Sequence, residues 1–149
     1  MLHSYEINIG TLAIVPIDET TTRIIEIGNE YIIDKPVFEI INESCCYYGS
    51  NYQGRYEGTK NMLGMSYKLP IIVEESRSII FFPTASPRLV ECAWISLNNL
   101  KNYVRCNKGS NITFKNDTNL NLNISIFTLE SQILRASRLE SILRSRKNQ

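Results

Sequence analysis

Short runs of β-branched and aromatic residues, broken every few positions by Gly, Pro or Asn, dominate this sequence. Residues 5–9 alternate apolar and polar, and residues 11–15 form a more apolar run that ends at Pro16. Runs of this length and composition are typical of β-strands. Further predicted strands cover residues 23–27, 31–33, 70–73, 79–82, 92–95, 112–114 and 120–126.

The middle of the chain holds one predicted helix and one segment that fits either a helix or a loop. Pro36 suits the first position of a helix, and Val37, Ile40 and Ile41 follow at spacings of three and four. We therefore expect a helix over 36–47. Residues 50–60 are rich in glycine, and they fit either a short helix started by Ser50 or a structured loop.

The last segment predicts an amphipathic helix that Thr128 caps. Arg144, Arg146 and Lys147 suit the negative end of this helix. The first interpretation of its apolar stripe is packing on the protein's own sheet, and the alternative is a subunit contact helped by Arg135 and Arg138. The stripe consists of Leu129, Ile133, Ala136, Leu139 and Leu143.

Strands with helices inserted and appended predict an α+β fold. We expect one strand-rich domain over residues 1–149, with an inserted helical or glycine-rich segment and a C-terminal amphipathic helix. The composition is ordinary for a globular protein, at 43% hydrophobic and 21% charged residues. The sequence has no apolar stretch of about 20 residues and no basic leader before a hydrophobic run, so we expect a cytoplasmic protein without a membrane partner.

Signatures of enzymes and of bound cofactors are missing from the sequence. His3 is the only histidine, which disfavours Ser/His and Cys/His nucleophilic sites. Glycine-rich phosphate-binding motifs are also absent. Cys45, Cys46, Cys92 and Cys106 lack metal-ligand spacing, so we expect reduced thiols that pack as small apolar groups. The sequence predicts a protein that is not an enzyme and has no metal and no cofactor.

Charge is distributed unevenly although the net charge is only +1. Residues 1–43 sum to −6, and residues 44–149 sum to +7. A surface that binds an anion is therefore expected after residue 43.

Residues 44–60 combine small residues, hydroxyls, an amide, tyrosines and two cations. Glycines let a backbone approach a phosphate closely, and free N–H groups at a helix start bind one. Ser50, Asn51 and Thr59 suit contacts to sugar or phosphate, and Arg55 suits a groove or a phosphate. The same tyrosines and glycines also fit a core and its turns.

Several ordered motifs then resemble one family. They are Ser44-Cys45-x-Tyr47-Tyr48-Gly49-Ser50-x-Tyr52-x-Gly54-Arg55-x-x-Gly58-Thr59, Lys68-x-Pro70-Ile71-x-Val73, Phe82-Pro83-Thr84-x-Ser86, Arg88 and Cys92-x-Trp94-Ile95-Ser96. In order and spacing they resemble the competence transcription factor (ComK) family, over about residues 4–105. Position 46 departs from the family, because a cysteine stands where a basic residue is frequent.

The resemblance implies a sequence-selective activator of competence genes that binds double-stranded DNA. It implies reading of paired A/T-rich promoter boxes, mainly through the minor groove, by a homodimer or higher homo-oligomer associated with the nucleoid. RNA polymerase is a further candidate partner. A narrow A/T minor groove is electronegative and attracts inserted Arg or Lys side chains.

Arg55 is the leading predicted DNA contact, and the alternative is a structural ion pair with Glu57 or Glu43. The complete set of predicted DNA-binding residues is Ser50, Asn51, Tyr52, Arg55, Thr59, Lys60, Lys68, Thr84, Ser86 and Arg88. Two other functions stay open. One is a protein-interaction module without DNA binding, and the other is a C-terminally shortened family member that binds DNA without activating.

Overall fold

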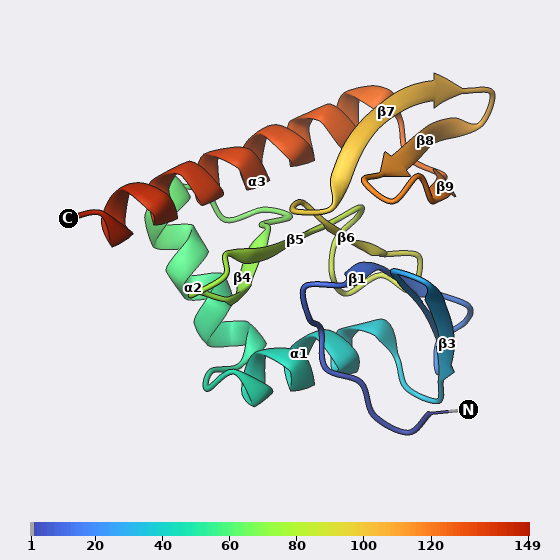
Figure 1. Ribbon diagram of the computed structural model, residues 1–149, viewed down its shortest axis with the longest axis horizontal. Coiled ribbons are helices and arrows are strands. Elements are labelled where there is room, and N and C mark those ends of the chain that lie inside the picture. Colours follow the sequence, from blue (N-terminus) through green and yellow to red (C-terminus); the bar gives the residue numbers. More distant parts are fainter. Residues whose placement is uncertain (1) are drawn as a thin grey trace.

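Two antiparallel sheets and three helices make up residues 2–149, the part of the chain that the computed structural model describes (Figure 1). The larger sheet has six strands in the order β3-β2-β1-β6-β5-β4, and the smaller has three in the order β7-β8-β9. The elements are β1 (Thr11–Pro16), β2 (Thr22–Glu26), β3 (Asn29–Ile33), α1 (Val37–Tyr47), α2 (Tyr52–Leu63), β4 (Ile71–Glu74), β5 (Ile79–Pro83), β6 (Trp94–Ser96), β7 (Leu100–Cys106), β8 (Gly109–Phe114), β9 (Asn119–Leu122) and α3 (Ile126–Lys147). The predicted α+β class is confirmed.

The central strands of the larger sheet are buried on both faces, which explains their apolar runs. In β5, Ile79 and Phe81 face one core cluster, and Ile80 and Phe82 face another. The helix α1 packs against the first face, whereas α3 and the smaller sheet cover the second. Figure 1 shows α2 at the β4 edge, where it lies between α1 and α3 and contacts both.

The N-terminal segment is not the strand predicted over 5–9. Residues 5–8 belong to no strand, and side chains satisfy their backbone instead. The Ile7 N–H donates to Ser44 Oγ at 3.0 Å, and the Tyr48 hydroxyl donates to the Ile7 carbonyl at 2.7 Å. The alternation of apolar residues was correct about burial at Tyr5 and Ile7 but not at Ile9, which is 61% exposed. The prediction of a strand was wrong, because residues 5–8 make no sheet hydrogen bonds to a neighbouring strand.

The predicted helix over 36–47 is confirmed, since α1 begins after Pro36 at its N-cap. The segment 50–60, for which helix and loop both stayed open, is helical and belongs to α2. Asn51 is its N-cap in place of Ser50. At the other end Gly64 has φ 70°, a left-handed conformation that favours glycine and that turns the chain out of the helix.

The C-terminal helix α3 begins earlier than predicted, at Ile126, because Ser125 rather than Thr128 is its N-cap. The predicted strand over 120–126 accordingly ends at Leu122. The apolar stripe packs on the protein's own sheets: Leu129, Ala136 and Leu139 are fully buried in the core. The structure therefore supports the first interpretation of the stripe, packing within the protein, over the subunit contact.

Strand β7 carried no sequence signal. Most of its side chains are exposed at the edge of the smaller sheet, so it lacks the apolar alternation of a buried strand. Within residues 2–149, no helix is long and apolar enough to cross a membrane.

Candidate nucleic-acid interface

A groove of about 350 Å³ lies where α2, the segment 66–69 and the loop 86–88 meet. The segment 66–69 follows α2 closely in sequence, whereas the loop 86–88 comes only after β4 and β5, and α1 adds Phe38 to the wall. Four of the predicted DNA-binding residues line the groove, namely Tyr52, Lys68, Ser86 and Arg88. The fold therefore brings together cations from two separate motifs of the sequence.

Two amide side chains fix the start of α2 beside this groove. Asn51 Oδ1 accepts a hydrogen bond from the Gly54 N–H at 2.7 Å. Asn42 Oδ1, reaching from α1, accepts one from the Tyr52 N–H at 2.8 Å. These bonds satisfy N–H groups that a helix start leaves free, so Asn51 serves as a cap in this structure.

Aromatic rings form the inner wall of the groove. The ring of Tyr52 lies edge-on to Phe38 with centroids 4.8 Å apart, and edge-on to Trp94 at 6.2 Å. Tyr56 lies one turn further along α2, with its centroid 6.1 Å from that of Tyr52. Burial raises the pKa of Tyr52 to about 12, so its hydroxyl is uncharged near pH 7.

Lys68 and Arg88 give the groove its charge. No acidic residue is among the residues that line it. Arg88 is exposed, and no carboxylate in residues 2–149 forms an ion pair with it. An unpaired guanidinium beside an ammonium group, with no carboxylate in the wall, is a surface that attracts phosphate.

Arg55 lies outside this groove. Its Nη1 atom is 3.1 Å from Glu75 Oε1, and only 14% of its side chain is exposed. The expected partners for a structural ion pair were Glu57 and Glu43, and the structure shows Glu75 instead. This geometry favours a structural role, and direct contact of Arg55 with DNA stays a prediction.

The remaining predicted residues lie around the groove without lining it. Thr59 is buried in α2, at 1% exposure. Thr84 Oγ1 accepts from the Ala93 N–H at 2.9 Å, which ties the 84–93 loop together. Lys60 is exposed and lines a separate hollow between α2 and residues 64–66. Ser50 lies just before α2, next to the Asn51 cap.

Several groove residues were missed from the sequence, chiefly Tyr67, Gln53 and Phe38. Tyr67 stands next to the predicted Lys68, so an aromatic neighbour of a candidate cation was the available signal. No pattern in the sequence indicates that residue 67 lies beside residue 88. That proximity follows from the antiparallel pairing of β4 and β5, which places the start of β4 and the end of β5 side by side.

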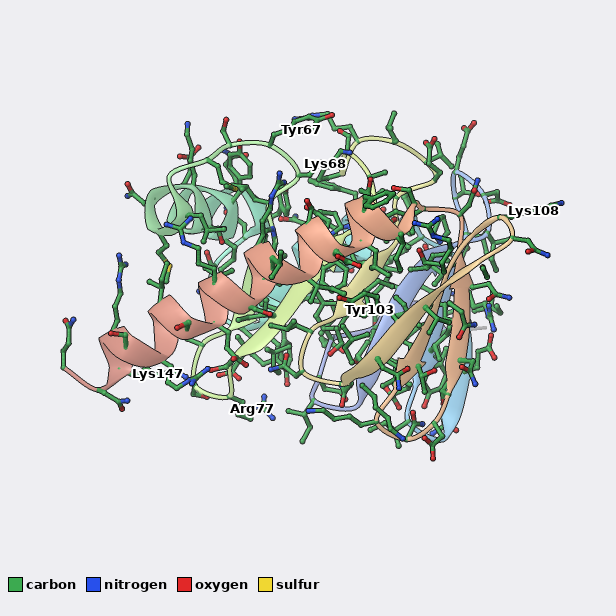
Figure 2. All side chains as sticks on the ribbon, turned by 90° about the horizontal axis from the view of Figure 1, so that it is seen from above. Tyr67, Lys68, Arg77, Tyr103, Lys108 and Lys147 are labelled. Carbon is green, nitrogen blue, oxygen red and sulfur yellow. The ribbon has the colours of Figure 1, made fainter. Side chains whose placement is uncertain are left out.

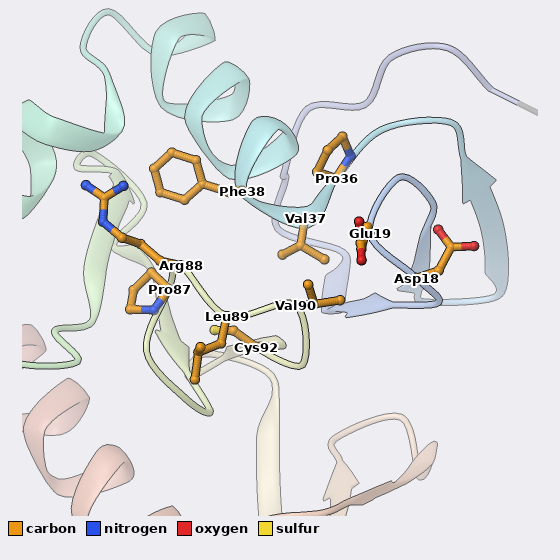
Figure 3. Close-up of a pocket in the computed structure, with 10 residues that line it drawn as sticks. All are labelled: Asp18, Glu19, Pro36, Val37, Phe38, Pro87, Arg88, Leu89, Val90 and Cys92. Carbon is orange, nitrogen blue, oxygen red and sulfur yellow. The ribbon is translucent and has the colours of Figure 1, made fainter.

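A second cavity, of about 290 Å³, adjoins the groove and shares Phe38, Pro87 and Arg88 with it (Figure 3). Asp18 and Glu19 line its other end. Figure 3 shows the Arg88 guanidinium directed away from these two carboxylates, toward Phe38. The carboxylates make this cavity unfavourable for phosphate, so the first groove is the better anion site.

All four cysteines are free thiols, but only Cys45 and Cys92 pack as small buried side chains, because Cys46 and Cys106 are exposed. Burial raises the pKa of Cys45 to about 12 and that of Cys92 to about 11, so neither thiol ionises readily at neutral pH. No group of three or more His, Cys, Asp or Glu residues within 2–149 is arranged to hold a metal ion.

The fold and the groove together define an α+β protein with a cationic, aromatic-lined surface site. A family model described as ComK protein matches residues 2–148. The competence transcription factor of Bacillus subtilis (strain 168) is 34% identical over 149 residues, which covers 97% of this chain and 78% of the relative. No solved structure matches the chain. The chain belongs to the ComK family.

Proposed function

We propose that this protein is a sequence-selective activator of competence genes that binds double-stranded DNA. The relative's name, competence transcription factor, supports this function, because the similarity extends over 97% of the chain. The groove between α2 and the 66–69 and 86–88 segments supplies the DNA-facing surface in this proposal.

The observation that carries the proposal is the pairing of Lys68 and Arg88 in a groove without acids. The net charge of +1 gives no general attraction to DNA, so affinity has to come from a local patch. Aromatic walls next to cations suit the sugars and base edges that lie between two phosphate backbones.

Reading of A/T-rich boxes through the minor groove is the finer part of the proposal. An A/T minor groove is narrow and electronegative, and it attracts inserted arginines. Arg88 fits this role because it is exposed and has no ion-pair partner within residues 2–149. Lys68, Ser86 and Tyr52 then contact the backbone alongside it.

Arg55 is assigned a supporting role in this proposal. Its ion pair ties α2 to Glu75 in the turn between β4 and β5. Because α2 carries Tyr52 and Tyr56, this tie holds one wall of the groove in place.

The assembly on DNA is a homodimer or higher homo-oligomer that binds paired boxes, with RNA polymerase as a further partner. The protein acts in the cytoplasm, at the nucleoid. The family suggests these partners and this location. Because the apolar stripe of α3 is buried in the core, the contact between subunits has to use another surface.

Fluorescence anisotropy with labelled duplexes tests the proposal. The protein should bind A/T-box duplex more tightly than G/C-rich duplex, and affinity should fall with rising salt because phosphate contacts release counterions. Arg88→Ala should weaken binding, whereas Arg146→Ala, an exposed cation in the last turn of α3, should not. Equal affinity for both duplexes removes sequence selectivity, and absence of salt-dependent binding favours the protein-interaction module.

A promoter assay addresses the remaining alternative. A protein that binds A/T-box DNA and raises transcription is an activator. One that binds without raising transcription is the shortened family member described above.

A further inference from the structure

The loop between α2 and β4 is held by side chains at three successive carbonyl groups. The Tyr56 hydroxyl donates to the Ser66 carbonyl at 2.7 Å. Arg135 Nη1 donates to the Tyr67 carbonyl at 2.9 Å, and Gln132 Nε2 donates to the Lys68 carbonyl at 3.0 Å. The donors come from α2 and α3, so two helices fix the backbone of a loop that crosses between them.

Further hydrogen bonds from α3 reach the end of α2 and the end of β5. Arg138 Nη1 donates to the Leu63 carbonyl at 3.4 Å, next to the Gly64 turn. Gln132 is itself buried, at 1% exposure, and its Nε2 atom also donates to the Pro83 carbonyl at 2.7 Å. Of the two arginines considered for a subunit contact, Arg135 therefore holds this loop and Arg138 holds the end of α2.

Lys68 has φ 51°, in the left-handed region that residues other than glycine rarely adopt. Such backbone strain persists only where the surroundings fix it, and it is concentrated at binding sites. Here the surroundings are the three carbonyl bonds, which hold Lys68 and its neighbour in a single arrangement.

The loop presents Tyr67 to solvent. Its side chain is 65% exposed although its backbone is fixed, and it lines the groove beside Lys68. Lys68 Nζ lies 5.3 Å from the centre of the Tyr67 ring, so a cation accompanies the aromatic face. Figure 2 shows both side chains on the loop beside α3, well away from the Lys108 hairpin.

We propose that Tyr67 is a wedge that stacks on a base step in the minor groove of the bound DNA. This inference rests on the proposed function and adds a residue to it. Proteins that bind the minor groove insert side chains between base steps and partly unstack them, which kinks the duplex. An aromatic ring on a rigid loop, flanked by Lys68 and Arg88 for the phosphates, provides the parts for this insertion.

Exposure alone does not single out Tyr67, because Tyr47 is 66% exposed. Tyr47 lies at the end of α1 and stacks edge-on against Tyr48, with centroids 5.1 Å apart. It does not line the groove. Tyr47 is therefore the matched control for every measurement on Tyr67.

The experiment uses an A/T-box duplex with 2-aminopurine at a TA step, whose fluorescence rises when the base unstacks. The parent protein, Tyr67→Phe and Tyr47→Ala should all raise the fluorescence on saturation. Tyr67→Ala should not raise it, and its affinity should fall by about 5- to 140-fold, the usual range for loss of one aromatic stack. Near-ultraviolet circular dichroism and thermal unfolding check that each variant is folded.

A second variant tests the role of the loop without changing the ring. Arg135→Ala removes the donor to the Tyr67 carbonyl and should reduce the fluorescence rise while leaving salt-dependent binding. The wedge proposal is wrong if Tyr67→Ala raises the 2-aminopurine fluorescence as much as the parent does. It is also wrong if the parent binds the duplex without raising that fluorescence. A parent that fails to bind A/T-box DNA at all overturns the proposed function, and the wedge with it.

Discussion

Arg55 Nη1 on α2 lies 3.1 Å from Glu75 Oε1 in the turn between β4 and β5, and the two side chains are 14% and 63% exposed. The cation is thus largely buried while its carboxylate partner remains in contact with water. A buried arginine contributes through the packing of its methylene groups as well as through its charge. This pair joins α2, which carries one wall of the groove, to the β4 edge of the larger sheet.

Arg55→Ala should lower the free energy of unfolding by about 1–3 kcal/mol, because it removes a charged hydrogen bond and the packing of a mostly buried side chain. Urea unfolding measures this change. Asn61→Ala, at an exposed position of the same helix, is the control and should stay within about 0.5 kcal/mol of the parent. A variant of unchanged stability that has lost DNA affinity would return Arg55 to the list of direct contacts.

Glu74 should make stability depend on pH in the acid range. Burial alone would raise the pKa of this carboxyl, but hydrogen bonds from Ser76 and Arg77 outweigh it and lower the pKa from 4.5 to about 2. Arg77 Nε donates to Oε2 at 3.0 Å, and the Ser76 N–H donates to Oε1 at 2.7 Å. Because hydrogen bonds in the folded state favour the ionised form of Glu74, this carboxylate stabilises the folded protein in full above about pH 4.5. This stabilisation is lost as pH falls toward about 2.

Urea unfolding at pH 7, 4 and 3 checks this dependence. The parent should lose more stability than Glu74→Gln as the pH falls, since the amide does not titrate. Glu91→Gln, at an exposed carboxylate, should follow the parent closely. Parallel curves for the parent and Glu74→Gln would contradict the assignment.

Two positions of α3 separate core packing from the surface of the helix. Leu139 is fully buried, and Leu134 is 69% exposed. Leu139→Asp should destabilise the fold by at least about 3 kcal/mol, because it removes core packing and buries an unpaired carboxylate. Leu134→Asp should change stability by less than about 0.5 kcal/mol. Thermal unfolding and size-exclusion chromatography measure both, and a folded, monomeric Leu139→Asp would instead support a subunit contact.

The sequence predicted the elements that face the core. Ile79 to Phe82 and the stripe around Leu139 show the apolar patterns that burial imposes, and both were placed correctly. Strand β7 was missed because its exposed face needs no apolar residues. The segment around Ile7 was assigned to a strand because its burial is real, whereas its hydrogen bonds come from Ser44 and Tyr48.

The candidate site was predicted only in part, for a different reason. Lys68 and Arg88 were identified from their motifs, but the grouping of their loops depends on tertiary packing. Tyr67 became a candidate through hydrogen bonds that Arg135 and Gln132 make to its loop across more than sixty residues of sequence. Such long-range contacts leave no local pattern, so a single sequence does not indicate them.

Lys68 and Lys108 provide the last test, because they are two lysines in contrasting positions. Lys68 lines the groove, whereas Lys108 lies at the tip of the β7–β8 hairpin, away from it (Figure 2). Each phosphate contact that a protein makes adds about one unit to the slope of log affinity against log salt concentration. Lys68→Gln should therefore reduce this slope by about one, and Lys108→Gln should leave it unchanged although both variants lose one positive charge. Anisotropy titrations of A/T-box duplex at four salt concentrations give the slopes. Equal reductions would show that overall charge drives binding, and a reduction for Lys108→Gln alone would move the DNA-facing surface to the hairpin.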